Sequence, residues 1–107
     1  MILIVLVVAL TGIHCSKHVT SCIKGKIDDI KAQPKWNPPA EIKEYEYNGQ
    51  KVYLFSSNCC DQYNVVYDKN CNMICAPSGG FAGGGDGKCK DFFEVAKFIR
   101  VVWKDQR

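Results

Sequence analysis

The stretch EIKEYEYNGQKVYLF, Glu41 to Phe55, places Asn48-Gly49 between two runs rich in aromatic and β-branched residues. An Asn-Gly pair in this setting is the strongest short-range signal for a β-hairpin with a two-residue turn. Such a turn fixes the register and predicts four facing pairs: Tyr47 with Gln50, Glu46 with Lys51, Tyr45 with Val52, and Ile42 with Phe55. The Glu46–Lys51 pair joins opposite charges across the strands, a contribution of up to about 1 kcal/mol.

Downstream of this hairpin, QYNVVYDKNCNMICAP (residues 62–77) predicts a second one. Val65 and Tyr67 alternate as in a strand, and the tripeptide Asp68-Lys69-Asn70 has the composition of a turn. The returning strand is expected to point three side chains to one face: Cys71, Met73 and Cys75.

The C-terminal segment DFFEVAKFIRVVWKD (residues 91–105) predicts a short helical turn from Asp91 to Ala96. A closing strand from Phe98 to Trp103 follows, because the residues there are mostly β-branched or aromatic. A single helix over the whole segment also fits the pattern, so both alternatives stay open.

Upstream of the first hairpin, CIKGKIDDIKAQP (residues 22–34) has Ile23, Ile27 and Ile30 at helical spacing. Lys and Asp residues occupy the opposite face, and Pro34 ends the helix. A helix of two to three turns is marginal alone, so its apolar face must dock on the sheet. The proline-rich stretch up to Ile42 is expected to be extended, with Trp36 in the core.

Seven cysteines in 107 residues predict a disulfide framework, since a core this small is marginal by itself. Six of them are expected in three bridges, each worth about 2–4 kcal/mol: Cys22, Cys59, Cys60, Cys71, Cys75 and Cys89. Cys59 and Cys60 are adjacent and are expected to bond to two different partners. The predicted fold class is α+β, a small disulfide-stapled domain with one N-terminal helix and β-hairpins that form an antiparallel sheet.

The seventh cysteine, Cys15, follows the unbroken apolar run from Ile2 to Leu10. A run of nine suits a signal-peptide core and is too short to span a bilayer. We therefore expect a signal peptide over residues 1–14, a lipid on Cys15, a tether over residues 15–21 and a cysteine-rich domain over residues 22–107. A secreted protein with Cys15 free and a protein kept by an uncleaved signal are the alternatives.

The glycine-rich stretch APSGGFAGGGDGKC runs from Ala76 to Cys89. It departs from a phosphate-binding loop, because Ala82 stands at the leading position and Cys89 follows Lys88. Asp86 is the lone carboxylate between Asp68 and Asp91, so a calcium site would be weak. The favoured interpretation is a tight turn between Cys75 and Cys89, permitted by glycines at positive φ: Gly79, Gly80, Gly83, Gly84, Gly85 and Gly87.

Other chemistry has little support in the sequence. The net charge of +3 is spread along the chain, so no basic patch indicates nucleic-acid binding. Zinc would need paired cysteine knuckles, and Cys71-x₃-Cys75 is the one spacing that resembles them. Both histidines, His14 and His18, precede the domain, which leaves no partner for a nucleophile there. We expect no enzyme activity and no cofactor.

The runs YDKNCNMICAPSGG and GGGDGKC, with CCDQY before them and VVWKD after them, resemble a family of small, uncharacterised cysteine-rich domains. Members of this family occur mostly in Bacteroidota and include proteins described as lipoproteins. The resemblance covers residues from about Cys22 to the end. It implies an exported, lipid-anchored protein and brings no activity, substrate or catalytic residue.

We therefore expect a non-enzymatic structural or interaction module in the cell envelope, at the outer membrane or in the periplasm. Its partners would be the membrane, through the lipid, and an unidentified protein. One alternative is a secreted protease inhibitor with Lys88 as the reactive residue of the glycine-rich loop. The other is a weak calcium-binding module built on Gly79 to Gly87. Exposed apolar surface on Trp36, Phe81 or Trp103 would mark a partner site, and burial in the core is an equally good interpretation of each.

Overall fold

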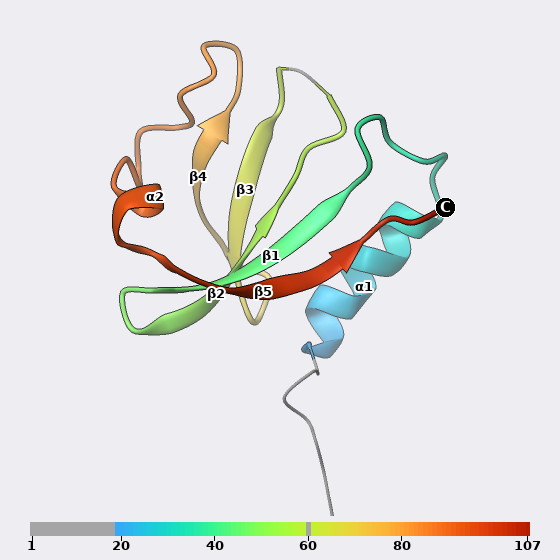
Figure 1. Cartoon of the computed structure of the whole chain (residues 1–107), viewed down its shortest axis with the longest axis horizontal. Helices are drawn as coiled ribbons and strands as arrows, with labels where there is room; N and C mark the ends of the chain where they lie inside the picture. Colours follow the sequence, from blue (N-terminus) through green and yellow to red (C-terminus); the bar gives the residue numbers. More distant parts are fainter. Residues whose placement is uncertain (1–18, 60) are drawn as a thin grey trace, which may run out of the picture.

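The computed structural model describes residues 19–59 and 61–107, which form one antiparallel sheet with a helix on either side (Figure 1). The strand order in the sheet is β4-β3-β2-β1-β5. This architecture confirms the predicted α+β class. The elements are α1 (Ser21–Lys31), β1 (Glu41–Tyr47), β2 (Gln50–Phe55), β3 (Tyr63–Asp68), β4 (Met73–Gly79), α2 (Phe92–Val95) and β5 (Lys97–Lys104).

The β1–β2 hairpin has the predicted register at all four pairs. Asn48 and Gly49 have φ values of 51° and 80°, as a two-residue turn with both central residues at positive φ requires. Lys51 faces Glu46 as predicted, but its ammonium lies 3.8 Å from the carboxylate of Glu44 instead. Glu44 is buried and Glu46 exposed, so the attraction to Glu44 is less screened by water.

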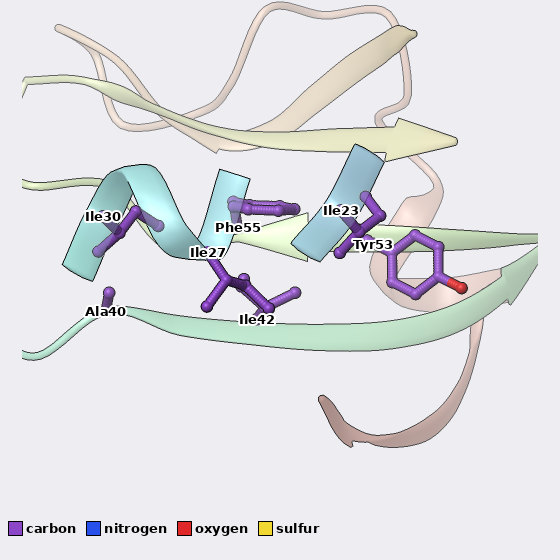
Figure 2. Close-up of a cluster of buried hydrophobic side chains, with 7 residues drawn as sticks. All are labelled: Ile23, Ile27, Ile30, Ala40, Ile42, Tyr53 and Phe55. Carbon is purple, nitrogen blue, oxygen red and sulfur yellow. The ribbon is translucent and has the colours of Figure 1, made fainter. Parts of the chain in front are cut away.

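Helix α1 covers one face of the sheet with the three isoleucines that the sequence predicted. These side chains pack on β1 and β2 in a first core cluster (Figure 2): Ile23, Ile27, Ile30, Ala40, Ile42, Tyr53 and Phe55. Trp36 and Trp103 are half-buried at the border of this cluster. The helix stops at Lys31, three residues before Pro34, because a proline disfavours helical backbone geometry in the residue that precedes it.

The start of α1 is joined to the turn between β3 and β4. Thr20 caps the helix by accepting a hydrogen bond from the Ile23 amide, and its hydroxyl donates to the Lys69 carbonyl at 2.6 Å. Cys22 is disulfide-bonded to Cys71 in the same turn, with a Cα–Cα distance of 6.0 Å. The helix thus begins at Ser21, before the predicted domain boundary at Cys22.

The second face of the sheet carries a separate core cluster: Tyr47, Val52, Val66, Cys75, Cys89 and Phe92. The prediction that Cys71, Met73 and Cys75 share one face is wrong. Met73 is 55% exposed, Cys75 is buried in this second cluster, and Cys71 packs against the first. The cause is a register shift between Val66 and Tyr67 in the β3–β4 pairing, which breaks the alternation of faces.

The C-terminal segment is a helical turn followed by a strand, so the alternative of one continuous helix is wrong. Asp91 precedes α2 and accepts a hydrogen bond from the Tyr47 hydroxyl at 2.9 Å, which raises the pKa of Tyr47. Phe92 follows and inserts between Tyr45 and Tyr47, with both ring centroids 5.0 Å away. This short helix therefore closes the second face of the sheet.

Truncation of Phe92 tests that role, and Phe93 is a matched control because it is 56% exposed. Phe92→Ala should lower the free energy of unfolding by about 3–5 kcal/mol, since it removes a fully buried ring. Phe93→Ala should cost less than about 1 kcal/mol, because the ring loses mainly its contact with Phe92. Chemical denaturation measures both, and equal losses would contradict the assigned role of Phe92.

Candidate functional site

A pocket of about 270 Å³ lies beside α1, where the end of β2 and the start of β3 meet the helix. We call it the α1–β3 pocket. Its lining comes from three stretches of the chain: residues 26–36, in α1 and just after it; residues 55–58, at the end of β2 and just after it; and residues 62–67, just before β3 and within it. The helix and two strands thus contribute to one depression.

Aromatic side chains line the inner part of the α1–β3 pocket. Phe55 is buried, and its ring meets that of Tyr67 edge to face with centroids 5.2 Å apart. The Lys26 ammonium lies over the Tyr67 ring, 4.2 Å from its centroid. An exposed cation–π contact of this kind contributes about 0.5–1 kcal/mol, so the contact helps to orient Tyr67.

Trp36 lines the pocket on the α1 side. Its indole N–H donates to the Gln33 side-chain oxygen at 2.9 Å, and the Gln33 amide nitrogen lies 3.4 Å from the Asp29 carbonyl. The indole is therefore held in place by a glutamine that is itself held by the helix. Asp29 and Gln33 are exposed and also line the pocket.

Tyr63 lines the pocket on the β3 side with a ring that is 45% exposed. Asn58 and Gln62 add side-chain amides nearby, and Ser57 adds a hydroxyl. Amides and hydroxyls both donate and accept hydrogen bonds. The pocket therefore combines aromatic surface with a polar rim, the usual composition of a ligand site.

The glycine-rich loop supports this polar and aromatic rim. A Cβ atom at Gly80 would lie 2.4 Å from Cε1 of Tyr63, and one at Gly79 would lie 2.4 Å from the Gln62 carbonyl oxygen. The Gly80 amide donates to that same carbonyl at 3.0 Å. The loop therefore packs its backbone against Gln62 and Tyr63, at a distance that only glycine allows.

Within the glycine-rich loop, backbone amides bond to the loop's own carbonyls. Gly83 donates to Gly80, Gly85 to Gly79 and Asp86 to Ala76, at 2.9–3.1 Å. The Asp86 carboxylate accepts a hydrogen bond from the Lys88 amide, which lowers the pKa of Asp86. This bonding supports the interpretation of a tight turn. Among residues 19–59 and 61–107 no group of three or more acidic, cysteine or histidine side chains is placed to hold a metal.

Four of the six domain cysteines form the bridges Cys22–Cys71 and Cys75–Cys89. Their thiolates are thus not available to zinc, and the Cys71-x₃-Cys75 spacing belongs to two different bridges. Cys59 is disulfide-bonded as well. Cys60, Cys15, the predicted signal peptide and both histidines lie outside the described residues.

The C-terminal residues clamp the end of α1 and the segment that leads to Trp36. Arg107 bonds its guanidinium to the buried Asp105 carboxylate at 2.8 Å and donates to the carbonyls of Lys31 and Gln33 at 3.0 and 2.9 Å. Arg107 lowers the pKa of Asp105 from 3.8 to about 2. The same contacts place Gln33 at the edge of the pocket.

The other buried carboxylate, Glu44, lies outside the pocket and joins β1 to β5. Arg100 Nε is 2.8 Å from Glu44 Oε1. Burial, and next the negative charge of Glu44, raise the pKa of Tyr53 on the neighbouring strand. Since β1 and β5 are also paired by backbone hydrogen bonds, we assign this ion pair to the sheet rather than to a site.

A domain family described as "Domain of unknown function (DUF6970)" matches residues 28–105. The chain belongs to this family. The match spans all five strands, α2 and most of the residues that line the α1–β3 pocket. No curated protein and no solved structure matches the chain.

The sequence did not predict the α1–β3 pocket, although it singled out Trp36 and the glycine-rich loop. Phe81, at the loop tip, is 93% exposed, and Trp103 contacts the first core cluster instead. A signal for the pocket did exist, because Gln62-Tyr63 begin the predicted second hairpin and Gly79-Gly80 follow soon after its end at Pro77. This signal could be interpreted only with the β3–β4 register known, because that register pairs Tyr63 with Gly79.

Two alanine substitutions distinguish the contact of the loop with the Tyr63 ring from the cost of a left-handed backbone. Gly80 and Gly83 both have φ of 83°, but a Cβ at Gly83 meets nothing within 4 Å. Each change should cost about 1–2 kcal/mol from the left-handed backbone. Gly80→Ala should also displace the Tyr63 ring, which Gly83→Ala should leave in place. Aromatic NMR shifts of Tyr63 report this, and unchanged shifts in both variants would contradict the support.

The ion pair between Asp105 and Arg107 predicts that the stability of the fold depends on pH. Because the folded pKa of Asp105 lies below 3.8, its stabilisation is complete above about pH 4 and is lost as the pH falls towards 2. Asp105→Asn should therefore melt at a lower temperature than the parent chain at pH 6. The difference should shrink between pH 4 and pH 2 in thermal unfolding curves. A difference in melting temperature that stays constant between pH 4 and pH 2 would contradict a stabilising role of the Asp105 carboxylate.

Proposed function

We propose that this protein is an exported, lipid-anchored, non-enzymatic interaction module that binds its partner in the α1–β3 pocket. The observation that carries the proposal is the pocket itself, with aromatic surface inside and a polar rim. It is built on a domain held by disulfides at Cys22–Cys71 and Cys75–Cys89. A site already rigid before binding loses little entropy when a ligand arrives.

The chemistry of the pocket favours binding over catalysis. Its polar groups are mainly amides and hydroxyls, which form hydrogen bonds but do not exchange protons near neutral pH. The Lys26 ammonium is engaged with the Tyr67 ring, and Asp29 is exposed on the helix surface. These groups suit recognition of a ligand rather than proton transfer to it.

Disulfides place the domain in an oxidising compartment, since cytosolic thiols are kept reduced. Among the described residues no helix is long and apolar enough to cross a bilayer. The apolar run before Cys15 supports export, and a lipid on Cys15 would account for the odd cysteine. The protease-inhibitor and calcium-binding alternatives stay predictions, which a trypsin titration and a comparison of melting with and without calcium test.

Replacement of Cys15 tests the anchor in the native host. The parent chain should sediment with membranes, dissolve only in detergent and carry a lipid on Cys15 in its intact mass. Cys15→Ser should move to the soluble fraction of the envelope or to the medium, because one lipid supplies the attachment. His18→Ala, in the same tether, should behave as the parent. A Cys15→Ser chain that stays on the membrane would overturn lipid anchoring.

A further inference from the structure

We infer that the α1–β3 pocket binds a neutral sugar unit of a glycan, an inference that rests on the binding role proposed above. The ring would pack its C–H face on the exposed aromatic surface of Trp36 and Tyr63. Its hydroxyls would bond to the amides of Gln33, Asn58 and Gln62. The juxtaposition of these five side chains, from three separate stretches of the chain, carries the inference.

The first argument is the presentation of the aromatic rings. Trp36 is only half-buried, and its N–H is already bonded to Gln33, so what the indole still offers a ligand is its carbon surface. Tyr63 keeps 45% of its surface exposed at a position where the backbone of Gly80 supports the ring. Hydration of an exposed aromatic face is unfavourable, and the C–H face of a sugar ring can pack on it and displace the water.

The second argument is the charge of the pocket. One base, Lys26, and one acid, Asp29, line it, and the base is engaged with Tyr67. A phosphate or sulfate ligand would need a cluster of arginines or lysines, and a cationic ligand would need a cluster of carboxylates. The pocket has neither arrangement, so its chemistry suits a ligand without charge.

The third argument is the polar rim. Each side-chain amide has two donors and an acceptor, and a hydroxyl both donates and accepts. Several side-chain amides around one pocket therefore match the hydroxyls of a sugar better than they match a peptide backbone, which offers one donor and one acceptor per residue. Asp29 adds a carboxylate that can accept two hydroxyl protons from neighbouring positions of one ring.

Size separates a sugar from a proline-rich peptide, the other ligand that aromatic grooves recognise. The cavity of about 270 Å³ is slightly smaller than typical ligand pockets, which begin at about 300 Å³. It suits one ring with part of a neighbour, whereas an extended peptide needs a groove several residues long. The outer ring of a glycan chain would enter the pocket while the rest of the chain stays in solvent.

The experiment uses the protein purified from its own host, titrated by NMR with four neutral hexasaccharides. These are β-1,4-linked glucose, α-1,4-linked glucose, β-1,4-linked xylose and α-1,6-linked mannose, each added to about 10 mM, which detects millimolar Kd values. At least one should shift the Trp36 indole signal. Gln62→Ala and Tyr63→Ala, both at exposed positions, should weaken that binding at least 10-fold. Phe93→Ala, an exposed aromatic outside the pocket, should leave it unchanged.

Two further probes separate this inference from the binding role: a proline decapeptide and a mixture of small aromatic fragments. Shifts at Trp36 and Tyr63 with these probes, and none with any sugar, would overturn the sugar assignment but leave the pocket a binding site. No shift with sugars, peptide or fragments would overturn both proposals. Sugar binding that Gln62→Ala and Tyr63→Ala do not weaken would place the sugar elsewhere and also overturn the inference.

Discussion

The two faces of the five-stranded sheet both have to be covered, and the described chain has one long helix with which to do it. Helix α1 covers the first face. The second is closed by the Cys75–Cys89 disulfide and Phe92, all three nearly or fully buried. With a sequence separation of 14 between the two cysteines, the bridge contributes about 3 kcal/mol by restricting the unfolded chain.

From that requirement follows the composition of the glycine-rich loop. The chain must leave β4, turn sharply and return to the buried Cys89, and it packs against its own backbone on the way. A Cβ at Gly85 would lie 2.2 Å from the Ala76 carbonyl oxygen. The same compact path brings Gly79 and Gly80 against Gln62 and Tyr63. Closure of the second face and support of the α1–β3 pocket thus share one segment.

Local signals predicted most of the fold. The Asn48-Gly49 turn sets its own register, and the isoleucine spacing of α1 depends on the helix period alone. The pocket depends instead on how segments far apart in sequence come together, such as those that carry Trp36 and Tyr63, and no local pattern encodes this. The exposure of Met73 escaped prediction for the same reason, since a bulge is a property of two paired strands. Nothing in the sequence distinguishes the two buried carboxylates, Glu44 and Asp105, from the exposed ones.

Their partners, Arg100 and Arg107, both come from the C-terminal segment. A buried ion pair is weak evidence of stability, but it disfavours arrangements in which either charge is left alone. Arg100 fixes β5 beside β1, and Arg107 fixes the end of α1 with the segment that carries Gln33. These pairs therefore specify where the pocket's α1 side lies relative to the sheet.

The proposed lipid anchor precedes α1 in the chain, and the α1–β3 pocket begins further along this helix. Helix α1 begins at Ser21 (Figure 1), next to the Cys22–Cys71 bridge, so a tether over residues 15–21 would lead to this end of the helix. The residues that α1 contributes to the pocket run from Lys26 to Ile30, and Gln33 and Trp36 follow. With a rise of about 1.5 Å per residue, Ile30 lies roughly 14 Å along the helix from Ser21. A lipid on Cys15 would therefore be attached upstream of the start of α1, whereas the pocket begins at Lys26, further along the helix, where a glycan would enter it.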